Sequence, residues 1–274
     1  MDTRKIKNFI VLVLLIVNAI LLAVVLTDAV RERGLSSGAV EGAAEILAAN
    51  GIDVSPEADL SERSLAVVEM RRDTGLERQL AENLIGECSV SDLGGNILHY
   101  VGPNGQANFR GTGSFEMQVY DGPNEGDPLD TARRCARELG LDTAREPLDY
   151  DIDERLSGTV ELACSYGGSR ILNCRVSFTF GSGELMMIIG TRSPDTAVSE
   201  SDVRLLDVPT VLLRFLAIVT ESGRVCSSLD TLELCYSMTA TAAGEAQLVP
   251  VWRIGTDAGD FFINAVTGAE EGLV

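Results

Sequence analysis

The sequence predicts an α+β protein in which an N-terminal transmembrane helix precedes units that each combine a helix with an antiparallel sheet. Three observations support this fold class. The chain starts with an uncharged apolar run, helical patterns recur further along, and segments of alternating apolar and polar residues follow each of them. With 274 residues, 45% of them hydrophobic, the chain is long enough for one or two domains and too apolar for a disordered protein.

The apolar run, Asn8–Thr27, holds no charged residue over twenty positions. A helix of that length crosses the hydrocarbon core of a bilayer, which is about 30 Å thick. A cleaved signal peptide is the alternative, but its apolar region usually spans about 7–15 residues and ends at small residues. Here Leu26, Thr27 and Asp28 end the run. We therefore expect an uncleaved, single-pass anchor in the cell membrane over residues 8–27.

Charge is distributed unevenly along the chain, whose formal net charge is −19. Residues 1–7 hold Arg4, Lys5 and Lys7 against Asp2, a net +2, so that −21 remains for the rest of the chain. Because basic flanks stay inside, we expect a cytoplasmic tail before the anchor and an extracytoplasmic domain after it. An acidic domain is a poor match for nucleic acid or anionic lipid, which leaves a protein as the expected partner.

One face of the anchor carries Leu14, Asn18 and Leu21 at helical spacing. An amide in the middle of a bilayer prefers a partner helix to lipid. These three residues are therefore the expected contact with another transmembrane helix, which could belong to a second copy of this chain. The alternative is that the single Asn18 is tolerated without any partner.

Beyond the anchor, we expect a membrane-proximal helix and linker over residues 28–72 and the α+β domain over residues 73–274. Helices are predicted where apolar residues recur at helical spacing between a capping residue and a glycine: Ser36–Asn50, Thr74–Gly86 with Thr74 as N-cap, Asp127–Gly140 and Val208–Glu221. Strands are predicted where apolar and polar residues alternate or apolar residues dominate: 97–101, a segment near Asn108, 113–120, 159–165, 174–180, 184–190, 231–239, 246–254 and 260–266. Helices starting near residues 75, 128 and 208 each precede such strands, which predicts three helix-plus-strands units.

The six cysteines, an even number, would permit disulfides in an extracytoplasmic domain. Only Cys164 and Cys174 can be compared by strand register. A hairpin loop at Gly168–Arg170 places them opposite each other, whereas a loop at Gly167–Ser169 offsets them and prevents a bond. Both also lie on apolar faces, where a reduced cysteine packs as a small hydrophobic residue. Whether they are bonded or reduced is left open.

The sequence contains no GxSxG, no phosphate-binding glycine loop and no CxxC, and a single histidine excludes sites that need two. That residue, His99, lies in a strand pattern without a neighbouring nucleophile, so we expect a structural role. Asp149, Asp151 and Asp153 resemble the start of a calcium loop, but Glu154 stands where that loop needs glycine. We expect no enzyme, cofactor or metal site. The remaining enzymatic alternative is a hydrolase with Asp151 and Glu154 as an acid pair.

The two ends of the chain resemble a known family. The start, MDTRKIKNFIVLVLLIVNAILL, is similar to that of the YycI regulatory proteins. The closing LVPVWRIGTDAGDFFINAVTGAEE resembles their last hairpin and that of PepSY-like modules, and LLRFLAIVTESGRVCSSLDTLELCYSM fits the helix-to-strand step before it. The resemblance implies a YycI/YycH-like fold and a regulator of the WalK sensor histidine kinase in two-component signalling, alongside a YycH-like partner. The alternative is a membrane-tethered PepSY-like module that binds an extracellular peptide or protease.

Within the closing hairpin, Leu248, Pro250, Trp252 and Ile254 share one strand face. A tryptophan on such an apolar face is expected in the core. The alternative is an exposed groove, in which Trp252 and the neighbouring Arg253 would contact a partner.

Overall fold

The computed structural model describes residues 38–272, apart from residues 124–125, 193–195, 202 and 241–245. The expected cytoplasmic tail and anchor, with Leu14, Asn18 and Leu21, lie outside the described residues. In the described part of the chain, no helix is long and apolar enough to cross a membrane.

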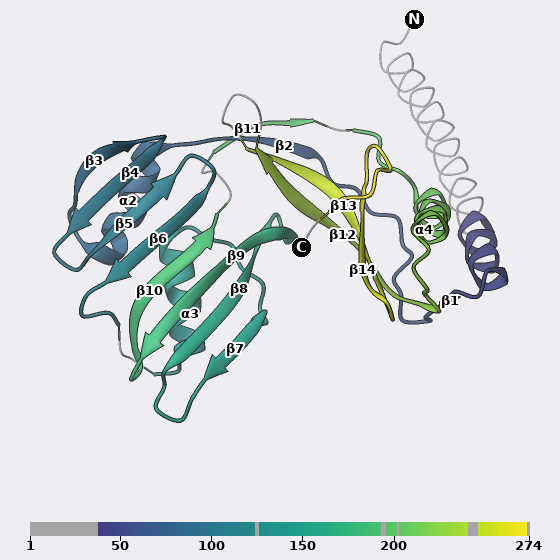
Figure 1. The fold of residues 1–274 in the computed structure, drawn as a ribbon. Helices are drawn as coiled ribbons and strands as arrows, with labels where there is room; N and C mark the ends of the chain where they lie inside the picture. The colour runs from purple at the N-terminus through teal and green to yellow at the C-terminus, as the bar shows by residue number, and fades with distance from the viewer. Residues whose placement is uncertain (1–37, 124–125, 193–195, 202, 241–245, 273–274) are drawn as a thin grey trace, which may run out of the picture.

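The described chain is α+β, as the sequence predicts, with one large and mostly antiparallel sheet (Figure 1). The helices are one over residues 38–49, α2 (Thr74–Ile85), α3 (Pro128–Glu138) and α4 (Val208–Ser222). The strands are β1 (Asp53–Val54), β2 (Val67–Arg71), β3 (Ser89–Gly94), β4 (Ile97–Gly102), β5 (Gly105–Arg110), β6 (Ser114–Val119), β7 (Asp149–Ile152), β8 (Gly158–Tyr166), β9 (Ser169–Gly181), β10 (Glu184–Thr191), β11 (Thr196–Ser201), β12 (Ser228–Ala240), β13 (Ala246–Thr256) and β14 (Gly259–Asn264). The main path of the sheet is β11-β2-β13-β12-β9-β10-β6-β5-β4-β3, with β8 and β7 branching from β9, and β14 pairing with β13.

An aspartate starts each labelled helix, because its carboxylate accepts hydrogen bonds from otherwise unpaired N–H groups of the first turn. Asp73 caps α2, with distances of 2.9 and 3.0 Å to two N–H groups, and Asp127 and Asp207 cap α3 and α4. The expected cap Thr74 is therefore wrong by one position. Asp73 has the extended backbone that a cap requires, and Thr74 is the first helical residue.

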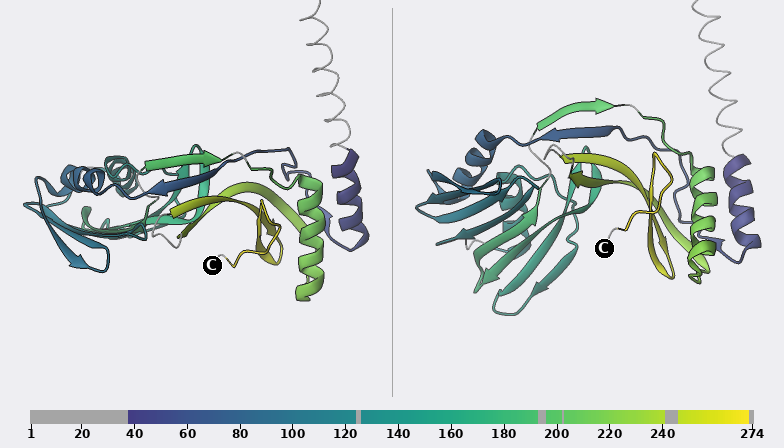
Figure 2. Two further views of the ribbon diagram at one scale, coloured as in Figure 1. Left: turned by 90° about the horizontal axis from the view of Figure 1, so that it is seen from above. Right: turned by 45° about the horizontal axis from the view of Figure 1, so that its top comes forward.

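The first apolar core lies between the sheet and the helices α2 and α3, which cover the same face of it (Figures 1 and 2). The sheet contributes a row of buried residues that lie opposite one another on neighbouring strands: Tyr100, Ala107, Met117, Ile188, Phe178 and Val160. The helices contribute small or apolar side chains that allow close approach, among them Ala81, Ile85, Ala132 and Ala136. Alternation along the strands therefore decides which face is covered.

The second apolar core lies where α4 and the helix over residues 38–49 stand side by side against β12, β13 and β14 (Figures 1 and 2). Leu47 comes from the first of these helices and Phe215 from α4, and both are fully buried. The Phe215 ring meets that of Phe261 on β14 edge to face, with centroids 5.1 Å apart. The segment that follows the expected anchor is thus packed into this second core.

The strands β12 and β13 form a long ribbon whose single apolar face serves both cores. Leu234 and Trp252, which pair across the ribbon, belong to the second core. Tyr236 and Leu248, on the same face, belong to the first. Tyr236 also pairs with Ile171, and this places the start of β9 parallel to β12. The ribbon therefore links the two cores covalently and by packing.

A buried ion cluster fixes the start of α2 to the sheet. Glu77, 2% exposed, accepts two hydrogen bonds of 2.8 Å from Arg72, and the Arg192 guanidinium lies 3.7 Å from the same carboxylate. Arg72 also donates to the carbonyl oxygens of Asn96 and Phe109, and Arg192 lies over the Phe109 ring. Two guanidinium groups thus meet one carboxylate in a region removed from water.

The turn between β8 and β9 differs from both loops considered above. Gly167 and Gly168 form a two-residue connection with φ of 57° and 81°, and only a residue without a side chain adopts two such angles at little cost. Farther from the turn the register shifts, so that Cys164 and Cys174 are not paired across the hairpin. Neither loop prediction is correct, because both assumed an unbroken register.

All six cysteines are buried and free. Burial raises the pKa of the Cys135 thiol from 9.0 to about 11, and raises the pKa of Cys164 and Cys235 to about 12. The pKa of Cys174 is raised even further by the same cause. These side chains therefore behave as neutral apolar residues and are weak nucleophiles.

Five described strands have no counterpart in the sequence prediction: β1, β2, β3, β7 and β11. The side chains of β3 are all exposed, and so are those of Asp149, Tyr150 and Asp151 in β7. The segment containing Asp149 and Asp151, which resembles the start of a calcium loop in sequence, is exposed to solvent and forms a strand paired with β8. For β3 and β7, backbone pairing at an open sheet edge leaves no apolar alternation in the sequence. β2 does alternate, with Val68 and Met70 buried, but it is only five residues long.

Replacing Glu77 by Gln should lower the free energy of unfolding by about 3–5 kcal/mol, because the buried Arg72 guanidinium loses the carboxylate with which it is paired. Glu82→Gln is the matched control: its ion pair with Arg78 lies on the helix surface, and we expect little change in stability. Urea denaturation of the purified full-length protein in detergent, followed by far-ultraviolet circular dichroism, measures both. Equal losses in the two variants would contradict the buried cluster.

Stability should fall as pH rises from about 9 to about 12. In this range the unfolded chain loses thiol protons that the folded chain retains, because burial raises the pKa of Cys135, Cys164 and Cys235. The pKa of Tyr100, raised by burial to about 12, adds to the same trend above pH 10. Urea midpoints at pH 8 and pH 10.5 test this, and a midpoint that does not change would contradict it.

A thiol assay in urea without reductant should count six groups.

Candidate functional site

The face of the sheet opposite α2 and α3 carries no helix in the described part of the chain (Figure 1). Across seven strands, from β4 to β7, one row of directly opposed residues lies on this face: His99, Asn108, Glu116, Ile189, Ser177, Glu161 and Asp149. Six of the seven side chains are polar, whereas the neighbouring row on the other face is the buried row of the first core. We call this surface the open face.

Two hollows lie along the open face. The sheet hollow, about 360 Å³, is formed by β5, β6, β8, β9 and β10 and is lined by Arg110, Ser114, Phe115, Glu116, Glu161, Arg175, Ser177, Ile189, Gly190 and Thr191. The junction hollow, about 330 Å³, lies between β8–β9 and β13–β14 and is lined by Leu148, Glu161, Arg170, Leu172, Asn173, Arg175, Arg253, Asp260 and Phe262. Because Glu161 and Arg175 line both, the two hollows adjoin.

Arginines concentrate in the junction hollow, although the chain as a whole is acidic. Arg175 lies 3.5 Å from Glu161, and Arg253 donates to Asp260 at 2.8 Å. Burial opposes the charge of Arg253, but the hydrogen bond and charge of Asp260, with Glu233, outweigh it and raise the pKa of Arg253. Both carboxylates of the hollow are thus already paired with an arginine.

Arg170, the third arginine of the junction hollow, directly follows the first residue of β9, after the turn made by Gly167 and Gly168. Its side chain forms no ion pair with any described residue, and its Nε is buried without a hydrogen-bond partner. The hollow therefore contains one cation without a counter-charge.

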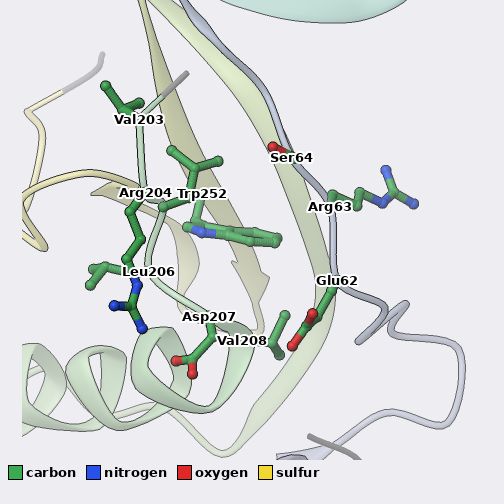
Figure 3. A pocket seen from close by; sticks show the side chains of 10 residues that line it. Glu62, Arg63, Ser64, Val203, Arg204, Leu206, Asp207, Val208 and Trp252 are labelled. Atoms are coloured by element: carbon green, nitrogen blue, oxygen red, sulfur yellow. The ribbon is translucent and has the colours of Figure 1, made fainter. Parts of the chain in front are cut away.

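The structure separates the two groove residues expected from sequence, because Trp252 and Arg253 point to opposite faces of β13. Trp252 is 1% exposed and packs in the second core, while Arg253 lines the junction hollow. The buried edge of the indole also lines a third hollow of about 260 Å³ (Figure 3), together with Glu62, Arg63, Ser64, Val203, Arg204, Leu205, Leu206, Asp207 and Val208. The Nε1 of Trp252 is buried and has no acceptor among the described residues.

The remaining candidates from sequence have local hydrogen bonds. The Nδ1 of His99 lies 2.8 Å from Oδ1 of Asn108, its cross-strand neighbour. The carboxylate of Asp153 accepts the N–H groups of Arg155 and Ser157 in its own turn. Within the described ranges, no three His, Cys, Asp or Glu side chains are arranged so that they could hold a metal ion.

Sequence reasoning missed Arg170 and Arg175 as site residues. Both lie on a strand that was analysed only for its apolar face, and their partners come from β8, β13 and β14. The one local signal was the Gly167-Gly168 dipeptide, which marks a tight hairpin and so the position of Arg170 at a strand start.

The comparisons with known proteins leave the family open. No family model and no curated protein matches the chain. An uncharacterized protein from Eubacterium rectale has a similar structure, with 12% identity, a TM-score of 0.46, and coverage of 81% of this chain and 90% of that one. The C-terminal domain of YpeB from Bacillus megaterium has 14% identity, a TM-score of 0.35, and coverage of 74% and 96%.

Trp252→Ala should lower the free energy of unfolding by about 3–5 kcal/mol, since it leaves a cavity in the second core. Trp252→Phe should cost clearly less, because a ring is retained and a buried donor without an acceptor is removed. Tyr120→Ala, at an aromatic side chain that is 49% exposed, is the control and should change stability little. Urea titrations measure all three. A Trp252→Ala protein as stable as the parent would mean that the residue is a surface contact.

Proposed function

We propose that the protein is a membrane-anchored, non-enzymatic regulator that takes up part of a partner protein on the open face of its extracytoplasmic domain. The observation that carries the proposal is the junction hollow, in which an acidic chain gathers three arginines from the strands β9 and β13 beside a polar, helix-free face. Concave sites with apolar walls and a few directed polar groups are typical of ligand and peptide binding.

The membrane part of the proposal rests on the sequence. The uncharged run Asn8–Thr27 with basic residues before it is typical of an anchor whose N-terminus is cytoplasmic. The resemblance of both chain ends to the YycI proteins suggests a sensor histidine kinase as the partner in the membrane, together with a YycH-like protein. Leu14, Asn18 and Leu21 would form the contact between transmembrane helices.

The described residues connect the open face to the helix over residues 38–49, which follows the expected anchor in the chain. The junction hollow is built partly on β13 and β14, which also belong to the second core. The helix over residues 38–49, which follows the anchor in the chain, packs into the same core through Ala43 and Leu47. A ligand that binds one arrangement of β13 and β14 more tightly would therefore shift the position of the anchor.

The second candidate is a tethered PepSY-like module that binds an extracellular peptide or protease without contacting a kinase. One observation favours it: both hollows are built entirely from residues beyond position 109, so they need no membrane segment. The two candidates differ in what the anchor does, since only the first requires a specific transmembrane sequence.

Replacing residues 8–27 by an unrelated transmembrane helix should abolish co-purification with the kinase from native membranes and change its autophosphorylation. Asn18→Leu should reduce co-purification severalfold, because a hydrogen bond between membrane helices contributes about 0.6–2 kcal/mol. Ile16→Ala, on the opposite face of the helix, is the control. Unchanged kinase signalling after deletion of the gene would overturn the proposal. Full activity of the swapped protein would favour the tethered module.

A further inference from the structure

The charges of the junction hollow do not balance. Glu161 is paired with Arg175, and Asp260 is paired with Arg253 at 2.8 Å, so each lining carboxylate already has its arginine. Arg170 remains, a half-buried cation that no described carboxylate neutralises. A partly desolvated cation without a counter-charge is unfavourable, and an anion supplied from outside would relieve this.

The chemistry of Arg170 selects the kind of anion. A guanidinium group presents parallel N–H donors that match the two oxygens of a carboxylate, and such charge-assisted pairs are among the strongest hydrogen bonds in proteins. The burial of Nε keeps that part of the group away from competing water. A carboxylate on the remaining N–H groups would therefore be bound in a low-dielectric environment.

The other wall of the hollow is apolar. Leu148, Leu172 and Phe262 line it, and none of the three is fully buried in the fold. The volume of about 330 Å³ is at the lower end for ligand pockets and suits one or two amino-acid residues. The site thus offers one cation and one apolar surface within the same small space.

A peptide C-terminus matches this pair of features better than a segment from the middle of a strand. In an extended chain, neighbouring side chains point to opposite faces, so an acidic side chain and its apolar neighbour cannot enter one hollow together. A C-terminal residue carries its carboxylate and its side chain on the same Cα.

We propose that the junction hollow binds the C-terminal residue of a partner peptide, with the carboxylate on Arg170 and an apolar side chain against Leu148, Leu172 and Phe262. This inference deepens the proposed function, on which it rests, because it states which part of the partner the outer domain recognises. Arg253 and Arg175 hold the walls of the site through their own ion pairs and raise the local positive potential.

The test uses N-acetyl-leucine, which reproduces a C-terminal leucine residue, and N-acetyl-leucinamide, which lacks only the carboxylate. Full-length protein in detergent at about 0.15 M salt, where charges are screened beyond roughly 8 Å, is labelled with ¹⁵N-arginine. The Nε–Hε signal of Arg170, assigned by its loss in Arg170→Gln, is followed as each probe is added. We expect N-acetyl-leucine to bind at least about tenfold more tightly than its amide, which lacks the charge-assisted pair. It should also bind more tightly than acetate, which keeps the carboxylate but lacks the apolar side chain.

Variants test whether the binding of N-acetyl-leucine depends on Arg170. With N-acetyl-leucine binding followed by calorimetry, Arg170→Gln should weaken it about tenfold or more, whereas Arg170→Lys, which keeps the charge, should weaken it less. Arg155→Gln removes an exposed arginine outside both hollows and should leave binding unchanged. The fluorescence of Trp252, in the second core, reports whether each variant is folded.

Three results would overturn the inference: equal binding of N-acetyl-leucine and its amide, binding of inorganic phosphate as tight as that of N-acetyl-leucine, or unchanged binding by folded Arg170→Gln. None of these depends on the kinase. The carboxylate site could therefore fail while co-purification with the kinase persists. If instead N-acetyl-leucine binds as expected and co-purification is lost, the protein is a peptide-binding module without a kinase partner.

Discussion

The packing of one apolar face of the β12–β13 ribbon is the constraint on which the rest of the structure depends. Leu234 and Trp252 pair across the ribbon in the second core, and Tyr236 and Leu248 continue the same face into the first. Side chains on one strand face are two residues apart, so a shift of register by one residue would remove both cores at once. The position of β9 beside β12, and with it the junction hollow, follows from this ribbon.

The sheet uses its two faces for different purposes. The face towards α2 and α3 buries apolar rows and supplies most of the stability, while the opposite face presents polar side chains to solvent. The ion cluster of Glu77 with Arg72 and Arg192 joins helix and sheet at one end of the first core. The hollows on the open face lie on the same sheet that this cluster joins to α2.

The elements that the sequence predicted are those with a local physical signal. The labelled helices follow from apolar stripes between capping residues and glycines, and β8, β9, β12 and β13 follow from runs in which apolar residues alternate or dominate. Exposed strands such as β3 and β7 were missed because nothing covers them, so their residues show no apolar period. The break in register between β8 and β9 was missed as well, because it depends on β9 leaving β8 to pair with β12.

The sequence by itself determined the mixed α+β class, the positions of the labelled helices and the strongest strands, and the acidity of everything after residue 7, since these follow from composition and local periodicity. Only the tertiary structure decided that Trp252 and Arg253 serve different environments, that all six cysteines are buried and free, and that Arg170 lacks a counter-charge. The reason is physical: the surroundings of a side chain depend on strands distant in the chain. Local patterns specify which face a residue occupies, and only packing specifies what that face meets.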